Sequence, residues 1–300
     1  MVISAPKEGV ITALWTPTDN HGKVLREELA VQIQFLRERG VHGLMVLGST
    51  GEFPHLEPGA RMEFLETVLS MSGPLSIMAN VSDIRPSVVA DLARSARGLG
   101  AQSVAVLAPW FYPLAQDDLQ EFFVRTGEAA ELPLFLYNFP ERTGNRIALD
   151  TISKVAARTK VAGVKQSGAE FEYHQPLAAL GREKGFVVFT GNEARLAEAM
   201  ALGVAGCVSG LANAVPELVV EIFSAAKRGA PAGAERASRR AREVTRLVDG
   251  LEFPLNVAAA MEARGLPVGQ PKSVVSAATR GRYERLVAAL RSLFRDWSLV

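Results

Sequence analysis

The sequence predicts a (β/α)8 barrel followed by appended C-terminal helices. Eight short apolar runs, each followed by a segment of helical periodicity, recur along roughly the first 230 residues. Successive runs end about 30 residues apart at first and about 20 apart later, the length of a strand–helix unit that adds a parallel strand. The count of eight favours a closed barrel over an open, doubly wound sheet. The predicted strands are residues 9–15, 42–47, 75–80, 103–109, 134–138, 161–167, 186–190 and 206–210.

The segments between these strands carry helix signals, and the pattern changes after residue 230. The helix after the third strand starts at Pro86 and ends before Gly100, because proline suits a first helical position and glycine the position just past the end. Beyond residue 230 only helical segments follow, at 234–251, 254–265 and 279–297. We therefore expect a barrel over residues 1–229 and a helical segment over residues 230–300 that packs on it.

Composition indicates an ordinary globular protein without a strongly charged partner. Lys plus Arg is 33 and Asp plus Glu is 32, so no overall field points to nucleic acid or to an anionic membrane. A single cysteine, Cys207, excludes an internal disulfide and fits a reducing compartment, and its apolar surroundings predict a packed thiol. Residues 1–15 lack the pattern of a signal peptide, and no stretch reaches the roughly 18 apolar residues of a membrane span. We expect a cytoplasmic protein.

Lys165 is the most informative residue, because it interrupts the apolar run of residues 161–167. A buried ammonium costs several kcal/mol unless it is paired or gives up its proton. An amine that loses its proton easily is a nucleophile toward carbonyl carbon, which is the chemistry of Schiff-base lysines. Position and residue type together predict a catalytic lysine.

Other candidate site residues also follow predicted strands, where the active residues of such barrels gather. Tyr137 ends the fifth strand, next to the strand of Lys165, and can shuttle protons there. After the second strand, Gly48, Ser49 and Thr50 form a turn whose N–H and hydroxyl groups suit a carboxylate or phosphate. After the seventh and eighth strands, small residues allow close approach of the backbone to a ligand, namely Gly191 and Ser209.

Taken together, in this order and at this spacing, these features resemble the dihydrodipicolinate synthase/N-acetylneuraminate lyase family of class I aldolases. The resemblance covers nearly the whole chain. The segments that carry it are residues 16–17, 48–52, 137–140 and 163–166.

The resemblance implies a mechanism without a metal or an organic cofactor. Lys165 would attack the ketone of pyruvate or another 2-oxo acid and form an imine, which stabilises the enamine made by C–C cleavage or by proton loss. Tyr137 would pass protons, and Ser49 and Thr50 would hold the pyruvyl carboxylate. The partners would be small 2-oxo acids and aldehydes, and the assembly a homotetramer built as a dimer of dimers.

The residues that would bind the aldehyde substrate give conflicting indications of its identity. Arg142 matches the arginine with which the synthases bind the far carboxylate of their aldehyde, which favours an acidic partner. The synthases, however, carry two tyrosines where this chain has Trp110 and Phe111, and Phe111 lacks the hydroxyl that completes their proton relay across a subunit interface. Tyr112, if its segment is extended, would face the other side. This aromatic cluster is either a subunit interface or covered by a loop.

The segments after the last two predicted strands indicate which subgroup of the family the chain resembles. Sialic acid lyases use an acidic pair after strand seven, whereas residues 191–194 offer only one carboxylate, Glu193. Residues 209–213 are more similar to members that handle 2-keto-3-deoxy sugar acids or hydroxy-oxo acids. We therefore expect a pyruvate-type aldolase or lyase of that class, with dihydrodipicolinate synthase as the alternative.

Three further readings remain open. One is a barrel that binds a 2-oxo acid without catalysis, although retention of the lysine, the tyrosine and the turn argues against it. A metal-dependent aldolase would need several ligands that converge on one ion, and the histidines are scattered. They are His21, His42, His55 and His174. The glycine-rich turns after strands seven and eight could instead bind a phosphate, which would leave Lys165 unexplained.

Overall fold

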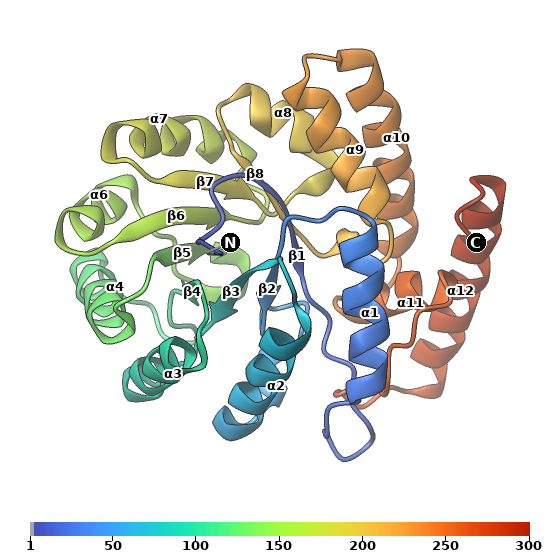
Figure 1. The fold of residues 1–300 in the computed structure, drawn as a ribbon, viewed down its shortest axis with the longest axis horizontal. Helices are drawn as coiled ribbons and strands as arrows, with labels where there is room; N and C mark the ends of the chain where they lie inside the picture. Colours follow the sequence, from blue (N-terminus) through green and yellow to red (C-terminus); the bar gives the residue numbers. More distant parts are fainter. Residues whose placement is uncertain (1–2) are drawn as a thin grey trace.

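Eight parallel strands close into a barrel, as the sequence predicts. The computed structural model describes residues 3–300, and in it each strand pairs with the next in sequence order, while β8 pairs with β1 (Figure 1). The barrel with appended C-terminal helices is thereby confirmed. The strands are β1 (Gly9–Ala13), β2 (Gly43–Val46), β3 (Ser76–Asn80), β4 (Ser103–Leu107), β5 (Leu134–Asn138), β6 (Val161–Gln166), β7 (Val187–Thr190) and β8 (Gly206–Ser209).

The strands are buried nearly throughout, which explains why they read as continuous apolar runs. Parallel strands of a barrel have helices on one side and packed side chains on the other, so neither face meets water. Several strands end earlier than predicted. β4 stops at Leu107 rather than at residue 109, where Pro109 has no N–H to donate to a neighbouring strand.

Amphipathic helices surround the barrel (Figure 1). Several begin with proline in the first turn, and α3 ends at Gly100, whose φ of 94° is the left-handed conformation expected of a C-terminal glycine. Among residues 3–300, none of the helices combines the length and the apolar character of a membrane span. The helices are α1 (Arg26–Glu38), α2 (Pro58–Met71), α3 (Pro86–Leu99), α4 (Gln116–Ala130), α5 (Pro140–Thr143), α6 (Leu149–Arg158), α7 (His174–Lys184), α8 (Leu196–Ala201) and α9 (Pro216–Lys227), with 3₁₀ turns η1 (Phe53–His55), η2 (Phe171–Tyr173), η3 (Glu193–Arg195) and η4 (Leu211–Asn213).

The C-terminal helices α10 (Pro231–Val248), α11 (Leu255–Ala263) and α12 (Ala277–Asp296) lie against one side of the barrel (Figure 1). α10 packs on α9 and on η3, and α11 packs on η4, so the segment touches the loops that follow β7 and β8. Arg264, just past α11, pairs with Glu217 of α9 at 2.7 Å. The Nε1 group of Trp15 donates a hydrogen bond to the Val268 carbonyl at 2.8 Å. The appended helices therefore form part of the surroundings of the barrel mouth.

Strand register brings the candidate residues together. Tyr137 on β5 lies opposite Lys165 on β6, which in turn lies opposite Phe189 on β7. Because all strands run in the same direction, their C-terminal ends open at one mouth of the barrel.

Close backbone packing at Gly206 gives a test of the closed barrel. A Cβ atom at this position would lie 2.0 Å from the Gly9 carbonyl oxygen of the neighbouring strand. We expect Gly206→Ala to lower the free energy of unfolding by roughly 1–3 kcal/mol, because strand backbone has to move apart.

Gly98→Ala is the matched control, since an added Cβ on this exposed position of α3 meets nothing within 4 Å. It should raise the free energy of unfolding by about 0.5–1 kcal/mol through helix propensity. Urea denaturation measures both changes, and equal effects of the two substitutions would contradict the close β1–β8 contact.

Candidate active site

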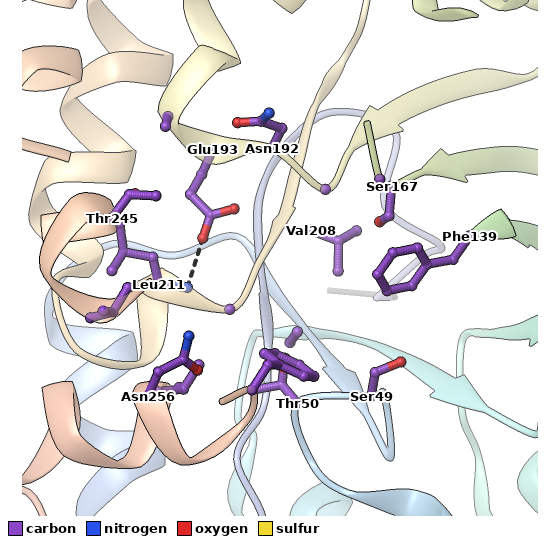
Figure 2. Close-up of a pocket in the computed structure, with 18 of the residues that line it drawn as sticks. Ser49, Thr50, Phe139, Ser167, Asn192, Glu193, Val208, Leu211, Thr245 and Asn256 are labelled. Atoms are coloured by element: carbon purple, nitrogen blue, oxygen red, sulfur yellow. Dashed lines mark hydrogen bonds between the residues drawn. The ribbon is translucent and has the colours of Figure 1, made fainter. Parts of the chain in front are cut away.

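A cavity of about 400 Å³ occupies the C-terminal mouth of the barrel. Its wall contains residues of β5 and β6, of the loops after β2, β7 and β8, and of α10 and α11. Figure 2 shows Ser49, Ser167 and Phe139 on one side of this space and Glu193, Thr245 and Asn256 on the other. The size suits a small organic molecule.

Lys165 lies in this wall with 6% of its surface exposed. Its Nζ atom is 3.9 Å from the ring centroid of Tyr137, within the range of a cation–π contact. Among residues 3–300, no carboxylate lies within 4.0 Å of this amine. The lysine therefore has an aromatic face beside it instead of an ion-pair partner, and its amine can reach a ligand.

Tyr137 is buried beside Lys165 and carries a perturbed hydroxyl. Burial raises the pKa of Tyr137, but the positive charge of Lys165 and polar interactions with Lys165, Ser49 and Ser167 outweigh it, so that the pKa lies below its usual value. A phenol that loses its proton more easily than usual is suited to proton transfer.

The turn after β2 presents two hydroxyl side chains to the cavity, those of Ser49 and Thr50. The turn is closed by hydrogen bonds from the Gly51 N–H to the Gly48 carbonyl at 3.0 Å and from the Glu52 N–H to the Ser49 carbonyl at 3.1 Å. Gly48 itself does not line the cavity; its carbonyl helps to close the turn. The cavity thus has two adjacent hydroxyl groups on one short loop.

The structure places the two candidates after β7 and β8 differently. Gly191 lines the cavity, and a Cβ atom there would lie 2.0 Å from Ser167 Oγ, so a larger residue would displace the Ser167 hydroxyl. Ser209 is fully buried behind the wall, where its Oγ accepts a hydrogen bond from the Ala212 N–H at 2.9 Å. Ser209 therefore shapes the loop after β8 without lining the cavity.

Arg142 is exposed at the mouth of the cavity. Its guanidinium carbon is 5.9 Å from the ring centroid of Phe139 and 5.4 Å from that of Phe253. The two rings hold the side chain at the entrance, where its charge faces solvent and incoming ligands.

The aromatic segment after β4 is not extended, so the condition under which Tyr112 would face the opposite side is not met. Phe111 has a φ of 80°, a left-handed conformation that turns the chain, so Tyr112 does not face the opposite side of an extended strand. The two rings instead pack edge to face with centroids 4.8 Å apart. Phe111 is 79% and Tyr112 65% exposed, so no loop within residues 3–300 covers them.

Glu193 and the C-terminal helices contribute side chains that were not among the predicted site residues. Desolvation raises the pKa of Glu193 above its usual value, although hydrogen bonds and the Lys165 charge act in the opposite direction. Its Oε1 atom accepts a hydrogen bond from the Leu211 N–H at 2.8 Å (Figure 2). From the C-terminal segment, Thr245 and Asn256 also line the cavity. Glu193 could be identified in the sequence as the one carboxylate of residues 191–194, whereas no local sequence pattern indicated that Thr245 and Asn256 would line the cavity.

A buried ion pair ties the C-terminal segment to the turn after β2. Lys272 donates to Glu52 at 2.8 Å and to the Thr16 carbonyl at 2.7 Å, and both members of the pair are at most 5% exposed. Lys272 also lies over the Trp15 ring at 4.9 Å. Glu52 has a φ of 55° at the end of the turn that carries Ser49 and Thr50. The ion pair therefore fixes the base of that turn.

The remaining nucleophilic and metal-ligating side chains lie apart from a common centre. Cys207 is buried on β8, and burial raises the pKa of its thiol well above the usual value, as expected of a packed thiol. Within residues 3–300, no three His, Cys, Asp or Glu side chains are placed to hold one metal ion.

Comparisons with known proteins converge on one family. The model of the dihydrodipicolinate synthetase family matches residues 6–293. An uncharacterized DapA-like lyase of Pyrococcus horikoshii is 31% identical, over 87% of this chain and 91% of the relative. A 4-hydroxy-tetrahydrodipicolinate synthase of Chlorobaculum parvum is 30% identical, over 93% of this chain and 97% of that protein. The crystal structure of dihydrodipicolinate synthase from Thermotoga maritima superposes with a TM-score of 0.89 at 25% identity, covering 98% of this chain and 99% of that one.

Removing one partner of the buried Lys272–Glu52 pair should be costly. We expect Lys272→Met to lower the free energy of unfolding by roughly 3–5 kcal/mol, because it leaves the Glu52 carboxylate buried without its cation. Lys227→Met is the control, since Lys227 pairs with Glu8 on the surface and such pairs contribute about 1 kcal/mol or less. Equal losses in urea denaturation would show that the buried pair has no special role.

Glu193 should make stability depend on pH. Because its folded pKa is raised, its contribution to stability is complete below the usual value of 4.5 and is lost as the pH rises through the folded pKa. The free energy of unfolding of the wild type, relative to Glu193→Gln, should therefore fall as the pH rises above about 4.5. Urea denaturation of both proteins across this range measures the difference, and a difference that does not change with pH would contradict the raised pKa.

Proposed function

The chain is a lyase that belongs to the dihydrodipicolinate synthetase family, and we propose that it makes or cleaves a carbon–carbon bond through an imine on Lys165. The observation that carries the proposal is the buried Lys165 amine, which lines a cavity of substrate size and has no ion-paired carboxylate among residues 3–300. Charged surface lysines lack both features, whereas a nucleophilic amine needs them.

The reaction begins when the amine adds to the ketone carbon of pyruvate or of another 2-oxo acid. Loss of water gives the imine, and loss of a proton from the methyl carbon gives an enamine. In the synthetic direction the enamine carbon adds to an aldehyde, whose oxygen takes up a proton and becomes a hydroxyl group. Water then hydrolyses the imine, which releases the product and regenerates Lys165. Cleavage follows the same steps in reverse.

Tyr137 supports these proton transfers. Its hydroxyl interacts with Lys165, and its lowered pKa favours exchange of a proton with a bound intermediate. Interaction with Ser49 and Ser167 holds the hydroxyl in place beside Lys165.

The turn after β2 is the proposed carboxylate site. Ser49 and Thr50 both present hydroxyl groups to the cavity. In the backbone of residues 3–300, the N–H groups of these two residues donate to no carbonyl, so they are also free for a ligand. Up to four donors on one turn suit the carboxylate of a 2-oxo acid.

The proposed substrates are 2-keto-3-deoxy acids or hydroxy-oxo acids rather than the aspartate semialdehyde used by dihydrodipicolinate synthases. Phe111 provides no hydroxyl for the relay of the synthases, and Tyr112 packs on Phe111 at the surface. Arg142 at the mouth is the feature that favours the synthase alternative. The exposed pair Phe111 and Tyr112 supports the proposed homotetramer, because such aromatic side chains are enriched in subunit interfaces.

Trapping of the imine tests the proposal. Borohydride reduction in the presence of pyruvate should add one pyruvyl group to the protein, and peptide mapping should locate it on Lys165. Lys165→Ala should abolish the adduct and turnover, while Lys154→Ala, which alters an exposed lysine of α6, should keep both. Turnover that persists in folded Lys165→Ala would exclude the mechanism.

Loss of the Tyr137 hydroxyl should affect chemistry more than binding. We expect Tyr137→Phe to lower kcat by roughly 10²–10⁴-fold, the usual contribution of a positioned acid or base, with a smaller change in the affinity for pyruvate. Steady-state kinetics and pyruvate titration separate the two effects. An unchanged kcat would remove Tyr137 from proton transfer.

A further inference from the structure

A second cavity, of about 210 Å³, lies beside α11 and apart from the candidate active site. Its wall contains residues of α11 and α12, of the segment that joins these two helices, and Trp15 after β1 (Figure 1). Along α11, Asn256 and Val257 line the active-site cavity, whereas Leu255 and Ala258 line the second one. Among residues 3–300 the two cavities share no lining residue, so they are separate sites.

The body of the second cavity is apolar. Trp15, which is 1% exposed, lines it together with Leu255 and Val268. The Nε1 group of Trp15 already donates to the Val268 carbonyl at 2.8 Å, so the indole offers a ligand only its apolar surface. Lys272, which lies over the Trp15 ring, is held by its pair with Glu52. This part of the cavity therefore suits a compact hydrocarbon group.

Two opposite charges border the apolar space. Glu262 comes from α11 and Arg280 from α12, and both side chains line the cavity. Within the described part of the chain, residues 3–300, neither has an ion-pair partner within 4.0 Å, and they are not paired with each other. The cavity thus presents one acid and one base that are both available to a ligand.

The Glu262 carboxylate is fixed by a neighbour of α12. Its Oε2 atom accepts a hydrogen bond from the Tyr283 hydroxyl at 2.7 Å. Burial, together with this hydrogen bond, raises the pKa of Tyr283 above its usual value, so the hydroxyl keeps its proton and remains the donor. The other carboxylate oxygen, Oε1, has no hydrogen-bond partner in residues 3–300 and can accept from a ligand.

We propose that this second cavity binds a small zwitterion with an apolar body, namely an α-amino acid with an aliphatic side chain. Its ammonium group binds the Glu262 carboxylate, and its carboxylate binds the Arg280 guanidinium. Its side chain packs on Trp15 and Leu255. Hydrogen bonds between charged groups are stronger than those between neutral groups, so each of the two contacts contributes to affinity. The proposal does not depend on the reaction at Lys165.

The surroundings exclude other classes of ligand. A phosphate or a dicarboxylate would bring negative charge beside Glu262, and a diamine would bring a second cation beside Arg280. A hydrocarbon without charged groups would take water from both side chains and offer them no partner. An amino acid with a charged side chain would place that charge on the apolar wall of Trp15 and Val268.

The test uses three compounds that share one aliphatic body. They are L-leucine, 3-methylbutylamine, which lacks the carboxylate, and 4-methylpentanoate, which lacks the ammonium group. In calorimetric titration of the whole protein, leucine should bind about tenfold more tightly than either analogue, because each analogue loses one charge-assisted contact. Absence of leucine binding, or equal affinity for all three compounds, would overturn the proposal.

Charge-neutral variants assign each contact to its residue. Glu262→Gln keeps an oxygen for the Tyr283 hydroxyl and should weaken leucine binding about tenfold, with no change for 4-methylpentanoate. Arg280→Gln should weaken leucine to a similar extent and leave 3-methylbutylamine unchanged. Glu284→Gln is the control, since Glu284 is exposed on α12 and does not line the cavity. Equal effects of Glu262→Gln and Glu284→Gln would contradict the assignment.

Competition with pyruvate locates the bound leucine. Saturating pyruvate should leave the leucine titration unchanged, because pyruvate belongs to the other cavity. Displacement of leucine by pyruvate, together with unchanged leucine binding in Glu262→Gln, would place leucine in the active-site cavity and overturn the proposal. Because these titrations do not involve the chemistry of Lys165, the second site stands or fails separately from the proposed function.

Discussion

A lysine amine kept inside a barrel, with no ion-paired carboxylate among residues 3–300, is the constraint on which the rest of the site depends. Lys165 is 6% exposed, and an unpaired ammonium costs several kcal/mol to bury, so the surroundings have to compensate. The register between β5 and β6 supplies the Tyr137 ring at 3.9 Å, and the same charge lowers the pKa of the Tyr137 hydroxyl. One contact thus stabilises the lysine and lowers the pKa of the phenol, as the proposed proton transfer requires.

The C-terminal helices complete the site that the barrel begins. Thr245 and Asn256 form one wall of the cavity, and Lys272 fixes the turn of Ser49 and Thr50 through its buried pair with Glu52. The barrel strands therefore position the Lys165 amine, to which the proposed function assigns the reaction, whereas the appended segment shapes the opposite side of the cavity. This division explains how a shared imine chemistry can be combined with different substrate chains.

Much of the fold and part of the site could be predicted from the sequence. Buried parallel strands are continuous apolar runs, and a lysine within such a run is conspicuous, so the places of Lys165 and of its neighbour on β5, Tyr137, at the barrel mouth could be predicted from the strand order, whereas their proposed roles came from the family resemblance. Pro109 ended β4 earlier than its apolar run suggested. Thr245 and Asn256 could not be predicted, because their place in the cavity depends on how α10 and α11 pack, and their own positions look like ordinary helix residues. The role of Ser209 behind the wall depends equally on tertiary contacts.

A crystal structure determined after soaking with pyruvate tests the central claim most directly. We expect continuous density from Lys165 Nζ to the ketone carbon of pyruvate, with the carboxylate on the turn of Ser49 and Thr50 and the Tyr137 hydroxyl beside the new imine. Pyruvate bound without a covalent link to Lys165, or with its carboxylate on Arg142 instead of this turn, would contradict it.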